Sequence, residues 1–201
     1  MKLFGSVTSP YARKCLVVAH ELGLFDQLQV KMLSTGPTTH NAELMQVNPL
    51  CKLPTLMTDD GMVLYDSRVI SDYLNEKAGG SLVPKDASRW QVRVTQSLAD
   101  GVLDAALLMR YEVALRPAEF RWDAWSQGQQ EKVLSALDQV ERTAAQCLAG
   151  VDLGTIGLAC ALSYLDLRFA DLGWRRTRPA LDAWMASFSQ RASMQATAFK
   201  S

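Results

Sequence analysis

The feature that most restricts the fold is an apolar run, residues 1–7, that leads through a short polar turn into an amphipathic helix pattern. The turn contains Ser9 and Pro10, and apolar residues then recur at helical spacing until Gly23. Serine is a favoured N-cap, and proline suits the first helical position because the N–H it lacks would be unpaired there. The pattern therefore predicts a buried strand, a tight turn and a helix that begins directly after Ser9.

The following stretch continues as alternating strands and helices. The predicted elements are strands at 27–33, 55–58 and 62–65 and helices at 41–47 and 67–77. The last two strands are joined through Asp60-Gly61, a hairpin signal, and Asp66 is a good N-cap for the last helix. We expect the first two strands of the chain to be parallel, because a helix connects them. The pattern completes a small α/β domain at residues 1–78.

Residues 79–88 form the predicted linker, because they combine a glycine pair and a proline with few periodic apolar residues. Beyond it the pattern is helical throughout, so residues 89–201 are predicted to form an all-helical bundle domain. The predicted helices lie at 89–115, 131–148, 156–171 and 179–190. Thr155 is the expected cap of the third helix, as a lone cap without a reciprocal carboxylate.

Charge and composition exclude several classes of function. Lys plus Arg and Asp plus Glu number 21 each, so no excess of basic residues favours nucleic acid or an anionic membrane. The sequence shows no secretory leader and no membrane-spanning apolar stretch, which predicts a cytoplasmic protein. The four cysteines are widely spaced and there are only two histidines, so we expect reduced thiols and no metal centre.

The turn at Ser9 has the form of a redox Cys-Pro-Tyr-Cys loop from which both sulfur atoms are missing. The free N–H groups and the positive dipole end of a helix N-terminus stabilise an anion or a thiolate. This turn offers those surroundings without a thiol of its own. Our interpretation is that the sulfur arrives on a substrate.

With these motifs the whole chain resembles the glutathione S-transferase superfamily, most closely its bacterial members with a Thr-Ser-Pro-Tyr motif. The resemblance is carried by Ser9-Pro10-Tyr11, by Asn48-Pro49-Leu50-Cys51-Lys52-Leu53-Pro54 and by Asp66-Ser67. It implies an N-terminal thioredoxin-like domain, a C-terminal helical bundle domain and a homodimer. It also implies transfer of glutathione, as co-substrate, to a small electrophile in a detoxification reaction that uses no metal.

The resemblance assigns roles to individual residues. Ser9 corresponds to the catalytic residue that hydrogen-bonds the glutathione sulfur. Leu53 corresponds to the residue whose backbone pairs with the cysteinyl part of glutathione, and Pro54 corresponds to a cis-proline. Asp66 and Ser67 correspond to the pair that binds the γ-glutamyl end. An Asp-Ser pair at a helix start has physical sense there, because it offers partners for both an ammonium and a carboxylate group.

Several assignments stay open at this point. Thr8 and Ser6 compete with Ser9 for the sulfur, and His40 and Lys52 are the candidate cations for the glycyl carboxylate. The helical domain would line the second-substrate site, for which the candidate residues are Tyr11, Met109, Arg110 and Tyr111.

Two other functions are compatible with the same fold. One is a glutathione-dependent reductase or isomerase. The mixed disulfide between protein and glutathione that such a mechanism uses is difficult to form at this site, because position 9 carries no cysteine. The other is a non-catalytic glutathione-binding or regulatory module.

Overall fold

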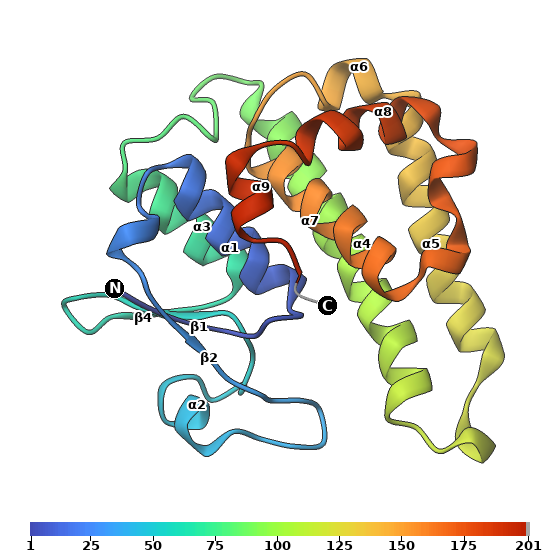
Figure 1. Cartoon of the computed structure of the whole chain (residues 1–201), viewed down its shortest axis with the longest axis horizontal. Coiled ribbons are helices and arrows are strands. Elements are labelled where there is room, and N and C mark those ends of the chain that lie inside the picture. The colour runs from blue at the N-terminus through green and yellow to red at the C-terminus, as the bar shows by residue number, and fades with distance from the viewer. Residues whose placement is uncertain (200–201) are drawn as a thin grey trace. The chain divides into compact units, whose positions relative to one another are not determined.

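The computed structural model describes residues 1–199, which form two compact units (Figure 1). The first unit contains residues 1–83 together with the segment from Arg191 onward, and the second unit contains residues 84–190.

The first unit is built on a four-stranded sheet with helices on both faces (Figure 1). Its elements are β1 Lys2–Gly5, α1 Pro10–Glu21, the 3-10 turn η1 Phe25–Gln27, β2 Gln29–Met32, α2 Ala42–Val47, β3 Thr55–Met57, β4 Val63–Leu64, α3 Ser67–Lys77 and α9 Ala192–Ala196. The strand order is β2-β1-β3-β4, with β1 parallel to β2 and antiparallel to β3. This confirms the parallel pairing expected across α1 and the hairpin between β3 and β4.

Strand β1 supplies core residues to both faces of this sheet. Successive strand residues point to opposite faces, and both Leu3 and Phe4 are almost completely buried. Phe4 packs with Leu44 of α2 and with Cys51, while α1 and α3 pack against each other. The arrangement is a thioredoxin-like layer structure in which the loops after β1 and β4 and the loop before β3 share one edge.

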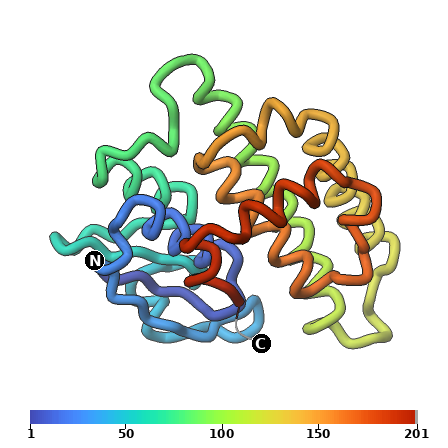
Figure 2. The backbone as a smooth tube through the Cα atoms, turned by 45° about the horizontal axis from the view of Figure 1, so that its top comes forward, coloured from blue at the N-terminus to red at the C-terminus, as the bar shows by residue number. Residues whose placement is uncertain are grey.

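The C-terminal segment lies with the first unit, although the sequence pattern grouped it with the preceding helices. Helix α9 packs against α1, and two views show them next to each other (Figures 1 and 2). Helical periodicity carries no information on which unit a short terminal helix covers. A helix of five residues depends on such packing, because it is too short to be stable by itself.

The second unit is a bundle of helices. Its elements are α4 Arg89–Ala114, η2 Ala118–Phe120, α5 Asp123–Arg142, α6 Ala144–Cys147, α7 Leu153–Arg168, η3 Ala170–Leu172, η4 Trp174–Thr177 and α8 Pro179–Phe188. Helix α4 packs along α7 and α5. Nearly every residue of α7 from Leu153 to Leu165 is buried, so this helix lies at the centre of the bundle.

Helix α7 begins three residues before the predicted Ile156, and a different residue caps it. Asp152 is the N-cap: its Oδ1 accepts the N–H of Thr155 at 2.8 Å, and the Oγ1 of Thr155 accepts the N–H of Asp152 at 2.9 Å. The expectation of Thr155 as a lone cap was therefore wrong. The reciprocal carboxylate lies before Thr155 in the chain, and a complete capping box starts the central helix.

Gly154, in the first turn of α7, permits the close approach of α4. A Cβ atom at this position would lie 2.8 Å from both the Cβ of Thr95 and the carbonyl oxygen of Val92. We expect Gly154→Ala to lower the free energy of unfolding by about 1–3 kcal/mol, because the added methyl group overpacks the contact between the two helices.

Gly128→Ala in α5 is the matched control, since a Cβ atom there would meet nothing within 4 Å. That change should raise the free energy of unfolding by about 0.5–1 kcal/mol through the lower conformational entropy of the unfolded chain. Chemical denaturation of the two variants measures the difference. A stabilising effect at both positions would contradict the tight contact at Gly154.

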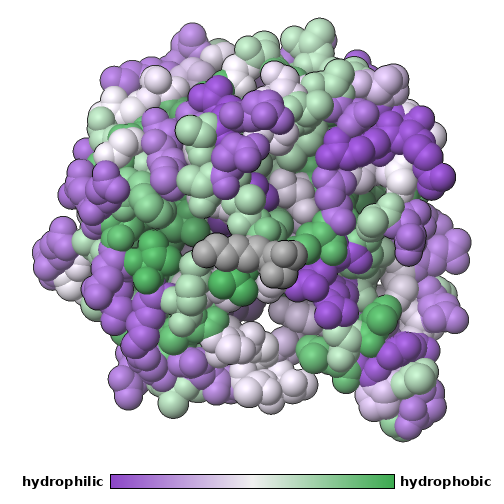
Figure 3. All heavy atoms as spheres, in the orientation of Figure 1, coloured by the Kyte–Doolittle hydropathy of each residue, from purple (hydrophilic) through white to green (hydrophobic). Residues whose placement is uncertain are grey.

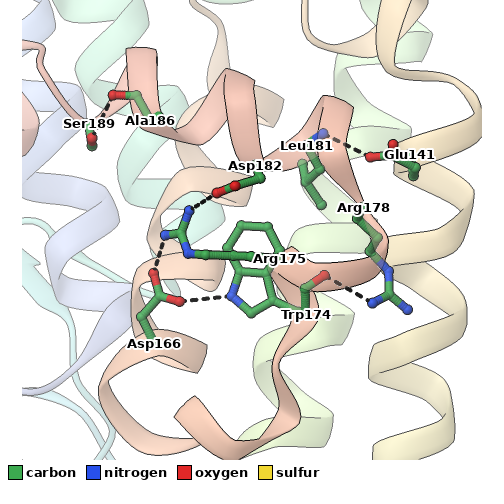
Figure 4. A network of polar contacts seen from close by, with 9 residues as sticks. All are labelled: Glu141, Asp166, Trp174, Arg175, Arg178, Leu181, Asp182, Ala186 and Ser189. Carbon is green, nitrogen blue, oxygen red and sulfur yellow. Dashed lines mark hydrogen bonds and ion pairs between the residues drawn. The ribbon is translucent and has the colours of Figure 1, made fainter.

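A polar network ties η4 to α7 and α8 in the second unit (Figure 4). Arg175 forms ion pairs with Asp166 and Asp182, and its guanidinium lies 4.3 Å from the ring centre of Trp174. Trp174 donates its indole N–H to Asp166 at 2.8 Å. Glu141 of α5 accepts an N–H from the first turn of α8 at 2.8 Å. The acidic groups of this corner are thus engaged with partners inside the unit.

On the face drawn in Figure 3, hydrophobic residues form separate areas among hydrophilic ones. Among residues 1–199, no single helix combines the length and apolar content needed to cross a membrane; α7 passes such a test only jointly with the bent segment after it. The same residues contain no group of three or more histidine, cysteine or acidic side chains that could hold a metal ion.

Candidate functional site

The turn between β1 and α1 places Ser9 at the start of a helix. Its N–H donates to the carbonyl oxygen of Ser6 at 3.2 Å, and its Oγ accepts the N–H of Ala12 at 3.2 Å. Ser9 is therefore the N-cap of α1, with Pro10 at the first helical position, as the sequence predicted. Because the hydroxyl oxygen is the acceptor in the cap, its proton can still be donated to another group. Capping and donation to a sulfur are compatible roles of one hydroxyl.

Leu53 precedes a cis peptide bond to Pro54, the geometry that the resemblance implied. Since β1 and β3 are antiparallel with Phe4 opposite Thr55, Pro54 lies beside the end of β1 that leads to Ser9. Among residues 1–199, the backbone N–H and C=O of Leu53 form no hydrogen bond. These two groups can pair with the backbone of an extended ligand, in the manner of an added strand.

The completely buried Asn48 holds the loop that carries Leu53. Its Nδ2 donates to the carbonyl oxygen of Lys52 at 3.1 Å and to the Oγ1 of Thr55 at 2.9 Å. Its Oδ1 accepts the N–H of Leu50 at 3.0 Å. The sequence analysis used Asn48 only as the end of a helix and missed this role. The sequence did contain a signal for it. The side-chain amide of Asn48 can donate and accept hydrogen bonds at once, and Asn48 lies next to a stretch with two prolines.

We expect Asn48→Ala to lower the free energy of unfolding by about 2–3 kcal/mol, because several buried polar groups lose their partner. Binding of glutathione, which the resemblance assigns to the backbone of Leu53, should weaken as well, since Leu53 loses its fixed orientation. Asn41→Ala is the matched control: Asn41 caps α2 by accepting the N–H of Leu44 at 3.0 Å, so its loss should cost about 1 kcal/mol with little change in affinity. Denaturation and calorimetric titration measure both quantities. The loop role is wrong if both variants lose affinity equally.

Asp66 is the N-cap of α3 and Ser67 is the first residue of that helix. The Oδ1 of Asp66 accepts the N–H of Arg68 at 2.9 Å, and its Oδ2 lies 3.0 Å from the Nη2 of Arg68. Burial raises the pKa of Asp66, but hydrogen bonds from Arg68 and the charges of Arg68 and Lys14 outweigh it, and the pKa is lowered. Asp66 is thus a carboxylate at neutral pH. It can accept an ammonium group, while Ser67 adds a first-turn N–H for an anion.

The topology brings these three segments to one edge of the sheet. Strand β3 runs away from the edge near Ser9 and β4 returns to it, so Asp66 follows β4 at the same edge. The thiol of Cys15 in α1 also lies 3.7 Å from the carbonyl oxygen of Ser67. A hydroxyl donor, a pair of backbone groups and a carboxylate at a helix start therefore lie along one edge of the sheet. Together they suit a short peptide with a thiol and a free α-amino acid end.

The remaining predicted residues occupy varied positions. His40 and Lys52 are exposed in loops, and Cys51 is buried in the core of the first unit. In α4, Met109 is buried and Arg110 is half-buried. Three further candidates of the first unit are half-buried: Ser6, Thr8 and Tyr11. The binding roles of these residues stay predictions.

The C-terminal segment is anchored to α1 by residues that the sequence analysis did not assign. Arg13, one turn after Ser9, donates from Nη2 to the carbonyl oxygen of Met194 at 3.1 Å. Glu21 accepts hydrogen bonds from Arg191 at 2.8 and 2.7 Å. Local spacing gave no signal for these bonds, because the partners lie 170 or more positions apart in the chain. The segment from Arg191 onward is thus hydrogen-bonded to α1, the helix that Ser9 caps.

The pKa of Glu21 is lowered by the hydrogen bond from Arg191, against burial, with a further contribution from Ser193. Because the pKa of Glu21 is lower in the folded than in the unfolded state, the unfolded state binds more protons at intermediate pH. The carboxylate therefore stabilises the fold at neutral pH. This stabilisation is lost as the pH falls through the folded pKa. We expect Glu21→Gln to lower the free energy of unfolding at pH 7 by about 1 kcal/mol. The deficit should shrink between about pH 5 and about pH 3.

Urea denaturation of wild type and variant at several pH values measures this deficit. Glu43→Gln is the control, since Glu43 forms a similar but more exposed pair with Lys31 and should matter less. A deficit for Glu21→Gln that is constant across the acidic range would contradict the role of its charge.

Comparison with known proteins agrees with this fold. The family models of the glutathione S-transferase N-terminal and C-terminal domains match residues 8–77 and 123–187. The uncharacterized GST-like protein YibF of Escherichia coli K12 is 33% identical over 202 residues, covering 98% of each chain. A glutathione transferase family member from Pseudomonas fluorescens Pf-5, crystallised with bound glutathione, is 44% identical with a TM-score of 0.97, covering 100% of this chain and 99% of that one.

A second structure of a family member from that organism holds S-(propanoic acid)-glutathione; it is 43% identical with a TM-score of 0.92 and covers 100% of both chains. The protein, with its thioredoxin-like unit and its helical unit, belongs to the glutathione S-transferase family. Its solved relatives from Pseudomonas fluorescens bind glutathione or a glutathione conjugate.

Proposed function

We propose that this protein is a glutathione transferase that binds glutathione at the edge formed by Ser9, Leu53 and Asp66 and transfers it to a small electrophile. The observation that carries the proposal is Leu53, whose backbone N–H and C=O are unpaired among residues 1–199 at the very edge where the helix of Ser9 begins. The bound glutathione and glutathione conjugate of the two relatives support the same ligand for this chain. The expected physiological role is detoxification of reactive electrophiles.

In this proposal each part of glutathione has a partner. The γ-glutamyl ammonium pairs with the carboxylate of Asp66, and the γ-glutamyl carboxylate meets the first-turn N–H of Ser67. The cysteinyl backbone pairs with the backbone of Leu53, which leaves the sulfur near the hydroxyl of Ser9. Lys52 and His40 are the candidate partners of the glycyl carboxylate.

Ser9 acts by donating a hydrogen bond to the thiolate and does not itself ionise. Lowering the thiol pKa from about 8.5 to about 6.5 requires roughly 2.7 kcal/mol. A hydrogen bond to a charged group supplies about 1.5–3 kcal/mol, and a helix N-terminus adds about 0.3–1 kcal/mol. The thiol proton goes to water. The thiolate then forms a bond to carbon, and the leaving group departs with the electron pair of the bond that breaks.

Calorimetric titration with glutathione, followed by assays with a panel of electrophiles, tests the proposal. We expect micromolar to millimolar binding and transfer to at least one electrophile. Binding without transfer would identify the glutathione-binding module instead, and absence of binding would remove the proposal altogether. Reduction of a glutathionylated thiol that is lost in Cys51→Ser would favour the reductase.

We also propose that the protein acts as a homodimer in the cytoplasm. Its four cysteines are free and buried, which suits a reducing compartment. Two large apolar side chains of α4, Trp90 and Val94, are exposed in the single chain and would be covered in a dimer. Light scattering at micromolar concentration tests the assembly, and a monomeric mass would contradict it.

A further inference from the structure

A buried thiol joins the loop between β2 and α2 to the segment that carries Leu53. The Sγ of Cys51 accepts the N–H of Asn41 at 3.3 Å, and its S–H faces the carbonyl oxygen of the same residue at 3.6 Å. The Oγ1 of Thr35 lies 3.2 Å from this sulfur and 3.3 Å from the carbonyl oxygen of Cys51. One side chain thus contacts the loop at two points, and all of these residues belong to the first unit.

The backbone of Cys51 has an unusual conformation for a residue with a side chain. Its φ is 50°, in the left-handed region where a Cβ atom is strained and glycine is favoured. Among residues 1–199, it is the one residue other than glycine with a positive φ. Glycine could adopt this conformation without strain, but it would offer no thiol to Thr35 and Asn41. The contacts of the thiol are therefore what the cysteine adds at this position.

The thiol connects the chain neighbours of two residues that can carry positive charge. His40 directly precedes Asn41, and Lys52 directly follows Cys51, so the hydrogen bond between Asn41 and Cys51 holds their backbones near each other. Both side chains are exposed, and in the part of the chain that the structure describes neither forms an ion pair. Lys52 is followed by Leu53, whose backbone groups are the proposed partners of the cysteinyl part of glutathione.

We propose that Cys51 is a positioning residue: its thiol fixes the loop of His40 beside Lys52, so that both side chains together bind the glycyl carboxylate of glutathione. This inference rests on the proposed function, because it concerns one end of the same binding site. Two cations that the protein holds in place bind a carboxylate more tightly than two mobile ones, because less conformational freedom is lost on binding. The thiol does not contact the ligand and acts through the two backbones.

Calorimetry with two matched ligands tests this role. Glutathione is compared with glutathione amide, in which a carboxamide replaces the glycyl carboxylate. We expect wild type to bind glutathione about 10-fold to about 100-fold more tightly than the amide. Cys51→Gly removes the thiol and suits the backbone conformation, so the variant should fold, but its preference should fall to about three-fold or less. Its affinity for the amide should stay within about two-fold of wild type, because the amide makes no use of the paired cations.

Further variants separate the thiol from its surroundings. Cys51→Ser restores a group that donates and accepts hydrogen bonds and should keep most of the preference. Thr35→Val removes the hydroxyl beside the thiol and should reduce the preference. Cys147→Ala is the matched control, because Cys147 is a buried thiol of the second unit with the hydroxyl of Thr143 at 3.6 Å; it should keep the full preference.

A double-mutant comparison shows whether the thiol acts through the cations. Lys52→Gln should itself remove most of the preference, and adding Cys51→Gly should then change little, because both substitutions act on one interaction. Additive losses would overturn the positioning role.

The remaining outcomes are equally distinct. An unchanged preference in Cys51→Gly, or an equal loss of affinity for both ligands, would overturn the role of the thiol. Equal affinity of wild type for both ligands would overturn the carboxylate site while glutathione binding still stands. Failure of wild type to bind glutathione itself would overturn the proposed function and this inference together.

Discussion

Replacing Ser9 by alanine is expected to slow glutathione transfer at neutral pH by about ten-fold to about 100-fold. The change removes the proposed hydrogen bond from the hydroxyl to the thiolate, a loss of about 1.5–3 kcal/mol. The pKa of the bound thiol should rise by about one to two units in consequence. The affinity for glutathione should change much less, because in the proposed site Leu53 and Asp66 bind other parts of the molecule.

The variant also loses the side chain that caps α1, for which we expect a stability decrease of about 1 kcal/mol. Assays are therefore run well below its unfolding temperature, and Ser9→Thr, which restores a hydroxyl and a cap, should recover most of the rate. Thr8→Val and Ser6→Ala are the matched controls for the two competing hydroxyl groups. Full activity in Ser9→Ala, with loss of activity in one of these controls, would move the role to that neighbour.

Asp66→Asn is expected to weaken glutathione binding by about ten-fold to about 100-fold. Asparagine keeps the side-chain oxygen that accepts the N–H of Arg68, so α3 retains its cap and the fold should be preserved. The change removes the negative charge that is proposed to pair with the ligand ammonium, an interaction worth about 1.5–3 kcal/mol as a charged hydrogen bond. Glu76→Gln removes the same charge from the exposed far end of α3 and should leave binding unchanged.

A second ligand separates the ammonium contact from indirect effects. N-acetylglutathione lacks the free ammonium group, so wild type should bind it more weakly by about the same factor. Asp66→Asn should show little further loss with this ligand, because the two changes remove one interaction. Additive losses would mean that Asp66 supports the site without contacting the ammonium.

The parts of the fold predicted correctly are those that neighbouring residues decide. Ser9 and Asp66 cap α1 and α3 as expected, because a cap needs only its own side chain and the N–H groups two or three positions later. The turn at Gly61 likewise follows from local backbone preference, since its φ of 87° suits glycine. A few consecutive residues are enough to determine such features.

Predictions failed where packing between distant segments decides. Apolar character alone would place Val69 of α3 in the core, but this side chain is 46% exposed, and Ser71 is buried instead, with its hydroxyl donating to the carbonyl oxygen of Ser67. Helix α5 begins at Asp123 rather than near residue 131, because its first two turns are polar and give no periodic apolar signal. Trp122 is mostly exposed at the start of that helix, although tryptophan favours a core or an interface.

The candidate site shows the same division. Leu53 and Asp66 were found through short motifs, whereas Asn48 and Arg13 act through partners that only the folded chain brings near. Short motifs thus indicate the candidate binding groups, and only packing shows which residues hold them in place.

The most direct test of the central claim is a pH titration of the thiolate absorbance of glutathione bound to the wild-type protein. With the hydroxyl of Ser9 and the N-terminus of α1 acting together, we expect a thiol pKa of about 6.5, two units below the usual value of about 8.5. A bound thiol that titrates at the usual value, under conditions where calorimetry shows the site to be saturated, would contradict the account.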